Sequence, residues 1–399
     1  MSKTILLISP IPTHPQLTGN CARVLMLFRS LRDLEYDVHF VHIQETPGDD
    51  EQMRQAWGVD HFHCIPYQRP KTNFKNLPRL TRKVFKRIRS IFDQNTRYIC
   101  SVDDAYDNQI NHTLTALAQK LQPDIVIGEY IFFSKALDCF GSNVLKIIDT
   151  HDIFADRHKV YLKNGETPRW YSTTEREEIK GLNRADAIIA IQEKEAEFFS
   201  KRLPSKSVVT VGHLVSLQPP IQRQQDRTIL FLGSSNHINI NGIQYFLQKI
   251  FPLVRAKMPD ATLILAGEIS KALEDCDGCI KLGIVDTPEE AYSSAAMVIN
   301  PVLFGTGLKI KTIEALAHSK PLVTTTAGAI GLEPGIGNAF LVKDSPTEFA
   351  DAIVQILADP VLYDKLAHSG YQFAKQWNYQ CLSSLENLLK SHLKHQKLT

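Results

Sequence analysis

Short, nearly continuous runs of Ile, Leu and Val recur along the whole chain and limit its fold more than any other feature. Segments with helical periodicity separate them. The runs lie at residues 5–8, 38–43, 125–127, 145–148, 187–191, 228–232, 261–265, 297–300 and 321–324. A strand that is apolar on both faces is typical of a parallel sheet with helices on both sides. The sequence therefore predicts an α/β architecture built on parallel sheets.

The stretch 203–227 interrupts this alternation with three prolines and a polar run. Directly after it, residues 229–233 restart the pattern of strand and glycine found at the N-terminus. We therefore expect two doubly wound, Rossmann-like domains, 1–205 and 206–376. Ligands of open parallel sheets bind beyond the carboxyl ends of the strands, so two such domains facing each other would form one cleft.

One segment of the second half combines glycines, lysines and a glutamate around a predicted helix start. It runs from Gly305 through Lys309 and Lys311 to Glu314, and a second glycine loop follows at 328–332. Backbone N–H groups and positive charge at a helix start favour a phosphate, whereas a carboxylate further along can accept paired hydrogen bonds from ribose hydroxyls. The pattern indicates a nucleoside diphosphate ligand. The alternative is an amphipathic helix with solvated lysines and a surface glutamate.

Composition adds limits on partners and compartment. The 399 residues carry a formal net charge of +2, which gives no general argument for nucleic acid. The seven cysteines form no paired framework, so we expect reduced thiols and a cytoplasmic protein, with Cys276 and Cys279 as two incidental thiols in a loop. The apolar run at residues 3–10 is too short for a signal peptide, and no run has the length of a membrane span.

Polar residues gather in the loops expected after the strands. The loop 149–152 places His151 between two aspartates, and the alternative role for this histidine is to cap the following helix. Glu129 follows another strand, either as a group on the acceptor side or as a surface carboxylate. Asp103 and Asp104 adjoin no phosphate loop, so we expect no metal-binding carboxylate pair there.

Together these motifs resemble the retaining glycosyltransferases of the GT-B fold, in particular the large family 4 group (glycosyl transferases group 1). The resemblance extends from residue 5 to about residue 377. It rests on the opening loop 10–20, the segments 182–191 and 263–267, and the glycine-rich stretches 305–314 and 328–332. It implies GT-B architecture with a C-terminal helix, 377–399, that returns to the N-terminal domain.

The resemblance also implies a role for individual residues. Glu314 would accept the ribose hydroxyls, Lys309 or Lys311 would face the diphosphate, and His151 with Asp152 would lie at the reaction centre. The remaining donor-binding residues would be Gly19, Asn20, Gly233, Gly305, Thr306, Gly307 and Leu308. The implied reaction moves a sugar from a nucleotide sugar to a saccharide or lipid-linked acceptor, as hexosyltransferases do, with no metal and no cofactor.

Two departures keep other functions open. Many members of the family have a glutamate where this chain has Thr306, and many have an arginine after the first strand of the second domain, where residues 233–237 contain none. A non-catalytic nucleotide-sugar-binding or scaffold subunit, or a sugar-nucleotide epimerase on the same fold, are the alternatives. Dehydrogenases and P-loop ATPases are disfavoured because the chain lacks their glycine motifs at the expected places.

Residues 69–89 include nine basic side chains and no acidic one. Apolar residues at four-residue spacing predict a basic amphipathic helix that lies on an anionic membrane surface. The acceptor or membrane contacts would come from Arg82, Lys83, Lys86 and Arg87. The alternative is a helix packed on the sheet with a solvated basic face. Nucleic acid is not an expected partner because no base-reading motif accompanies the charges.

Overall fold

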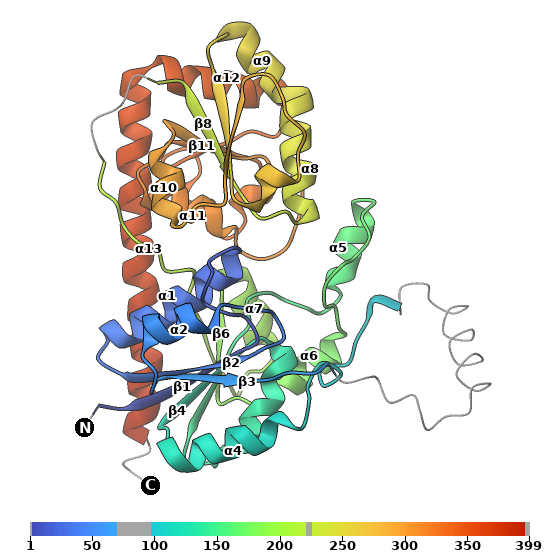
Figure 1. Cartoon of the computed structure of the whole chain (residues 1–399), viewed down its shortest axis with the longest axis vertical. Coiled ribbons are helices and arrows are strands. Elements are labelled where there is room, and N and C mark those ends of the chain that lie inside the picture. The colour runs from blue at the N-terminus through green and yellow to red at the C-terminus, as the bar shows by residue number, and fades with distance from the viewer. Residues whose placement is uncertain (1, 70–96, 221–225, 396–399) are drawn as a thin grey trace, which may run out of the picture. The chain divides into compact units, whose positions relative to one another are not determined.

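The structure, a computed structural model, describes residues 2–69, 97–220 and 226–395. By the packing of its backbone, the chain divides into two compact units (Figure 1). Unit 1 holds Met1–Pro15, Leu27–Val211 and Ser384–Thr399, and unit 2 holds Gln16–Met26 and Gly212–Ser383. The domain limits predicted from the sequence at 205 and 376 stay predictions.

Unit 1 is built on a seven-stranded parallel sheet with the strand order β3-β2-β1-β4-β5-β6-β7. The strands are β1 (Thr4–Ser9), β2 (Asp37–Ile43), β3 (Phe62–Ile65), β4 (Ile125–Glu129), β5 (Leu145–Asp149), β6 (Ala187–Ala190) and β7 (Ser207–Thr210). The order of strand addition reverses between β1 and β4, which pair directly. Such a switch point is where open α/β sheets bind ligands at their carboxyl ends.

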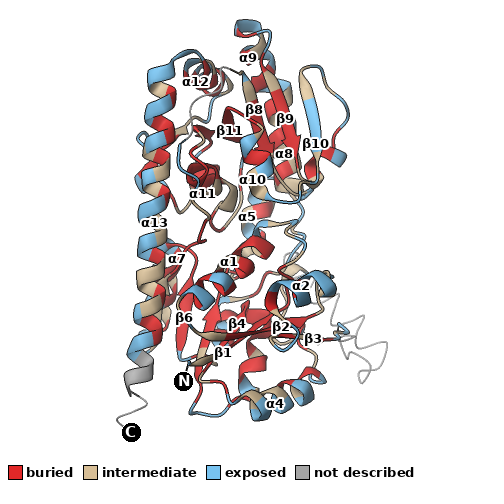
Figure 2. Ribbon diagram, turned by 60° about the vertical axis from the view of Figure 1, so that its left-hand side comes forward, coloured by how far each residue is buried: buried red, intermediate tan, exposed pale blue. Residues whose placement is uncertain are grey.

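Helices cover both faces of this sheet, with α1 and α2 on one face and α4 on the other (Figures 1 and 2). The helical segments are α1 (Gly19–Asp33), α2 (Asp50–Trp57), α4 (Ile110–Leu121), η3 (Ile131–Cys139), α5 (Arg157–Lys163), α6 (Glu175–Leu182) and α7 (Glu193–Arg202). The central strand β1 is buried from Ile5 to Ser9. Burial on both faces explains why the strands are continuous apolar runs.

Unit 2 contains a six-stranded parallel sheet with the order β10-β9-β8-β11-β12-β13, which reverses between β8 and β11. The strands are β8 (Thr228–Leu232), β9 (Thr262–Ala266), β10 (Cys279–Gly283), β11 (Met297–Asn300), β12 (Leu322–Thr324) and β13 (Leu341–Val342). The helical segments are α8 (His237–Tyr245), η4 (Phe246–Ile250), α9 (Phe251–Lys257), η5 (Glu268–Lys271), α10 (Pro288–Ser293), α11 (Ile310–Ala317), η6 (Ala327–Ala329), η7 (Glu333–Gly335), α12 (Pro346–Ala358) and the part of α13 (Pro360–His395) that precedes Ser384. Phe231, Phe246, Leu265 and Phe349 are fully or almost fully buried in its core.

The predicted parallel-sheet architecture is confirmed, and each predicted apolar run overlaps a strand. The sequence did not reveal β3, β7, β10 or β13, of which the first three are four or five residues long and β13 has two. All four lie at or next to a sheet edge, where one side of a strand lacks a neighbour. Ile280 and Leu282 of β10 are accordingly exposed, and β10 is pale blue in Figure 2. Edge strands need no continuous apolar run.

The prediction of two incidental thiols in the 276–279 loop is wrong, because Cys276 and Cys279 form a disulfide. Their spacing places the two Cα atoms 5.4 Å apart, which is within the range of disulfides. The other five cysteines are free thiols. Within the residues that the structure describes, no helix has both the length and the apolar character that crossing a membrane requires.

Candidate active site

The glycine-rich turn before α11 has the backbone geometry that its sequence predicts. Gly305 and Gly307 have φ angles of 138° and 68°, which side chains disfavour. The ammonium of Lys309 donates to the carbonyl oxygens of Thr306, at 2.7 Å, and Gly307, at 3.1 Å. Leu308 is buried. The positive charge of Lys309 is therefore held over the turn that leads into α11.

Hydrogen bonds fasten α11 to the second glycine loop. The amide of Asn300, at the end of β11, donates to the Thr312 hydroxyl at 3.0 Å, and that hydroxyl donates to the Gly328 carbonyl at 2.8 Å. A Cβ on Gly328 would lie 2.0 Å from the Thr324 hydroxyl oxygen, so only glycine fits there. The two glycine-rich stretches are therefore held against each other by these hydrogen bonds.

Lys311 points to the end of β8. Its ammonium donates to the side-chain oxygen of Asn239 at 2.7 Å and lies 4.4 Å from the ring centroid of Phe231. A Cβ on Gly233 would lie 3.3 Å from that ammonium, and a Cβ on Gly267 would lie 2.5 Å from the Gly233 carbonyl oxygen. Burial lowers the pKa of Lys311 to about 7. The switch point between β8 and β11 therefore holds a cation that can change its charge near neutral pH.

Glu314 lies on the same helix in a site that is largely shielded from solvent. Its side chain is 14% exposed, and its two oxygens lie 3.4 Å from Nε2 of His213 and 3.1 Å from the Tyr292 hydroxyl. Burial raises the pKa of the Glu314 carboxyl, but the hydrogen bond and charge of His213 outweigh it, so the pKa is lower than usual. The alternative interpretation of Glu314 as a solvated surface residue is wrong. Each oxygen keeps a further lone pair for a ligand hydroxyl.

The opening loop contributes Gly19 and Asn20, at the start of α1, to unit 2. A Cβ on Gly19 would lie 3.2 Å from Cδ1 of Ile310, the first residue of α11. The side-chain oxygen of Asn20 accepts hydrogen bonds from the Thr18 hydroxyl and from the backbone N–H of Cys21. Unit 2 therefore brings together the predicted donor-binding residues: Gly19, Gly233, the 305–309 turn, Lys311 and Glu314.

In unit 1, His151 follows β5 and is buried between two carboxylates. Its Nε2 contacts Glu129, at the end of β4, and lies 3.6 Å from the Asp149 carboxylate. Both acids are fully buried. Because both carboxylates face Nε2, they favour a proton on that nitrogen. The two alternative interpretations, a helix-capping His151 and a surface Glu129, are wrong.

Backbone strain accompanies this contact. His151 and Tyr130 have φ angles of 62° and 66°, and their rings stack with centroids 4.0 Å apart. Left-handed backbone costs about 1–3 kcal/mol for residues with side chains, and it clusters at functional sites. The surrounding contacts therefore fix the orientation of the His151 ring.

Asp152 does not contact His151 through any hydrogen bond or ion pair of the described structure. Instead its carboxylate accepts a hydrogen bond from Nε of Arg157 at 2.7 Å. The following turn is held by Glu178, whose two oxygens accept from the N–H groups of Phe154, at 2.8 Å, and Ala155, at 2.9 Å. Burial raises the pKa of Glu178 to about 7. Glu129 and Asp149, and not Asp152, are the carboxylates that contact Nε2 of His151.

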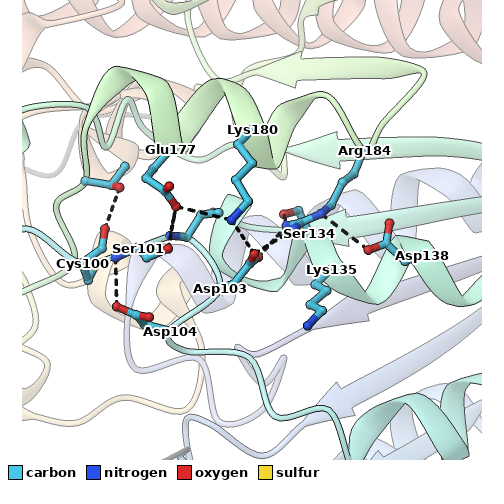
Figure 3. Close-up of polar contacts among 12 residues, drawn as sticks. Cys100, Ser101, Asp103, Asp104, Ser134, Lys135, Asp138, Glu177, Lys180 and Arg184 are labelled. Carbon is cyan, nitrogen blue, oxygen red and sulfur yellow. Dashed lines mark hydrogen bonds and ion pairs between the residues drawn. The ribbon is translucent and has the colours of Figure 1, made fainter. Parts of the chain in front are cut away.

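Asp103 belongs to an ion-pair network, shown in Figure 3, that binds the 101–104 turn to α6. Its carboxylate lies 2.7 Å from both Lys180 and Arg184, and Arg184 also donates to the Ser134 hydroxyl at 2.9 Å. Glu177 accepts from the Ser101 hydroxyl at 2.6 Å. Lys180 and Arg184 therefore pair with the Asp103 carboxylate, and the prediction that Asp103 and Asp104 form no metal-binding pair stays a prediction.

Several contacts escaped the sequence analysis. His213, Tyr292 and His318 surround Glu314, and Tyr130 stacks on His151. His213 and Tyr292 come from other segments with no shared motif, whereas His318 directly follows α11. Of these residues, position after a strand could have marked Tyr130. Arg82, Lys83, Lys86 and Arg87 lie outside the described residues, and their predicted role stays a prediction.

Glu129, Asp149 and His151 also offer ligand atoms within 4.8 Å of one another, which is close enough to hold a metal ion. Two carboxylates and one imidazole suit a divalent cation. The prediction that transfer needs no metal therefore remains a prediction.

Comparison with known proteins places these features in context. Residues 226–359 match the family model described as glycosyl transferases group 1. Over 177 residues the chain is 26% identical to an uncharacterized 44.6 kDa protein in the cps region of Klebsiella pneumoniae. The match covers 41% of this chain and 45% of that protein, so the chain spans less than half the length of this curated relative.

The fold has counterparts over nearly the full chain. TarM from S. aureus has a TM-score of 0.67 at 12% identity, covering 97% of this chain and 99% of TarM. Sucrose-phosphate synthase from Thermosynechococcus elongatus has a TM-score of 0.68 at 17% identity, covering 98% of this chain and 99% of that protein. The pneumococcal O-GlcNAc transferase GtfA has a TM-score of 0.66 at 11% identity, covering 98% of this chain and 99% of GtfA.

At these identities the structural likeness shows the fold alone, and the sequence match falls on the strands and helices that carry Gly233, Lys311 and Glu314. The chain thus has the GT-B fold, and its residues 226–359 are similar to glycosyl transferases group 1.

Proposed function

We propose that the protein is a retaining glycosyltransferase that moves a sugar from a nucleotide sugar to a saccharide or lipid-linked acceptor. The observation that carries the proposal is the arrangement on α11. A shielded carboxylate, Glu314, and a buried lysine, Lys311, lie on one helix that begins at a glycine turn. Glu314 suits the hydroxyls of a ribose, and Lys311 with the glycine turn suits a diphosphate.

The same residues suit the chemistry of transfer. Negative charge builds on the departing diphosphate as the bond to the sugar breaks. Lys311, Lys309 and the N–H groups of the 305–309 turn would stabilise that charge more in the transition state than in the ground state. In unit 1, the fixed ring of His151 would present Nδ1 to a hydroxyl of the sugar or acceptor. In our proposal the protein supplies this charge itself, without a metal.

Proteins similar to this chain support the substrate class and setting. TarM and GtfA were crystallised with UDP, and the Klebsiella pneumoniae relative lies in a cps region. We therefore place the protein in polysaccharide or glycolipid assembly, in the cytoplasm and at the inner membrane face. The basic segment 69–89 would provide the membrane contact.

The first test is the thermal stability of the purified protein against UDP-, GDP-, ADP- and CMP-sugars. A ligand that binds only the folded protein raises the midpoint by mass action. We expect one nucleotide to raise it and Glu314→Ala to remove the effect. No shift with any nucleotide sugar, together with no transfer to saccharide acceptors, would contradict the proposal. The anomeric configuration of the product then tests retention, and activity in excess chelator tests metal independence.

A further inference from the structure

Three side chains at the edge of the unit 1 sheet meet at one point. His42 is near the end of β2, Cys64 lies opposite it in β3, and Asp50 is the first residue of α2. Nδ1 of His42 lies 3.6 Å from Oδ1 of Asp50, and one ligand atom from each of the three residues lies within 4.8 Å of the other two. His42 and Cys64 are register partners on neighbouring strands, so the sheet itself sets their spacing.

The hydrogen bonds around this point leave two buried polar atoms facing each other. Nε2 of His42 contacts the carbonyl oxygen of Thr46 at 3.1 Å, and since a carbonyl only accepts, Nε2 carries a proton. The other ring nitrogen, Nδ1, faces the carboxylate oxygen Oδ1 of Asp50. Both atoms are buried, and neither has a hydrogen-bond partner among the described residues.

A metal ion at this point would give both buried atoms a partner, and the Cys64 sulfur lies close enough to share it. We propose that His42, Asp50 and Cys64 bind a divalent transition-metal ion such as Zn²⁺. At ligand distances of about 2.0–2.1 Å, tetrahedral geometry separates nitrogen and oxygen ligands by about 3.3 Å, close to the observed distance. Imidazole and thiolate ligands disfavour Mg²⁺ and Ca²⁺. Water or an external ligand completes the fourth position.

The groups behind the three ligands are already oriented. The Thr46 carbonyl accepts from His42, and the side-chain amide of Gln44 donates to the other oxygen of Asp50 at 2.9 Å. Such contacts fix the tautomer and aim the ligand atoms in known metal sites. Binding replaces the Cys64 thiol proton, which is released to solvent: R–SH plus M²⁺ gives R–S–M⁺ plus H⁺. The metal would fasten β2, β3 and α2 together.

A second cluster in the same unit lacks these features. Asp37, His39 and His61 also offer three ligand atoms within 4.8 Å, but they include no sulfur. Nε2 of His61 contacts Asp37 at 2.9 Å and Nδ1 of His39 contacts His63 at 3.2 Å, so one nitrogen of each ring already has a hydrogen-bond partner. The experiment below separates the two clusters.

Full-length protein is reduced with a phosphine, stripped with a chelator and titrated with Co²⁺ and then Zn²⁺. We expect one equivalent of Co²⁺ to produce a sulfur-to-cobalt charge-transfer band, Zn²⁺ to displace it, and bound Zn²⁺ to raise the melting temperature. Cys64→Ala should abolish the band. His61→Gln and the double variant Cys276→Ser, Cys279→Ser should keep it, since those residues belong to other clusters.

Gln44→Ala keeps all three ligands and loses only the support of Asp50, so Zn²⁺ affinity should fall about 10- to 100-fold. This variant keeps the proposal testable if Cys64→Ala does not fold. The absence of a charge-transfer band in the wild type would overturn the proposal. So would a band that persists in Cys64→Ala, or a Zn²⁺ affinity that Gln44→Ala leaves unchanged.

Discussion

Glu314 and Lys311 lie less than one helical turn apart, yet their surroundings favour the charged form of Glu314 and the neutral form of Lys311. Donors surround the Glu314 carboxylate and favour its ionised form. The Lys311 ammonium donates to Asn239 beside the Phe231 ring, but desolvation by burial lowers its pKa, because the charged form loses its contact with water. The helix therefore carries one group that is charged before a ligand binds and one that a diphosphate would charge on binding.

Glu314→Gln tests the ribose contact with little change of shape. An amide keeps one acceptor but loses the charge, and hydrogen bonds to charged groups contribute about 1.5–3 kcal/mol. The dissociation constant of the donor, measured by calorimetry, should therefore rise about 10- to 150-fold. Glu289→Gln, at a more exposed acid 3.9 Å from His318, should bind like the wild type. Equal affinity in both variants would reject the ribose role.

Lys311 predicts proton uptake when the donor binds. With a pKa of about 7, its side chain is mostly neutral at pH 8, and a bound diphosphate raises that pKa. Calorimetry at pH 8 in buffers of different ionisation enthalpy should reveal uptake that approaches one proton. Lys311→Met should remove the uptake, whereas Lys343→Met should leave it unchanged. A binding enthalpy independent of buffer would contradict this assignment.

At the scale of elements, α6 organises the loops of unit 1. Glu178, in its first turn, holds the 153–155 turn, and Glu177 and Lys180 hold the 101–104 turn. Arg184, just past its end, completes the network of Figure 3. One short helix thus positions the chain that follows His151 and a second turn from a distant part of the sequence.

Glu178 predicts a pH dependence of stability. Its pKa is about 7 in the folded protein and 4.5 in an unfolded chain, so the folded state binds more protons between these values. The stabilising contribution of Glu178 is therefore full below pH 4.5 and declines as the pH rises to 7. The urea midpoint of the wild type relative to Glu178→Gln should be higher at pH 5 than at pH 8. Glu175→Gln, at an exposed acid of α6, should follow the wild type, and a constant difference would reject the linkage.

Arg184→Ala should destabilise unit 1 by about 1.5–3 kcal/mol, because it removes charged hydrogen bonds to Asp103 and Ser134. Arg184 is 14% exposed in its side chain, so solvent replaces these bonds poorly. The matched control is Lys390→Ala, which breaks an exposed pair with Glu386 and should cost less than about 0.5 kcal/mol. Similar urea midpoints for both variants would show that the network contributes little.

At the scale of the whole molecule, the proposed membrane binding depends on a local concentration of basic residues more than on the net charge. The formal charge is +2, while nine basic residues occupy 69–89. Replacing Arg82, Lys83, Lys86 and Arg87 by Ser should abolish sedimentation with anionic vesicles at low salt, because each basic residue near such a surface contributes about 1 kcal/mol. Neutral vesicles serve as the control. Unchanged binding to anionic vesicles would refute the membrane role.

The sequence by itself determined the parallel-sheet architecture, because strands buried on both faces must be continuously apolar, as at β1 and β8. It also identified the turn at Gly305 and Gly307, since their positive φ angles require glycine. Only the tertiary structure decided which partners meet: Glu129 with His151, His213 with Glu314, and His42 with Asp50 and Cys64. These contacts depend on the order of the strands in each sheet, which brings distant segments together. The local periodicity of the sequence does not specify that order.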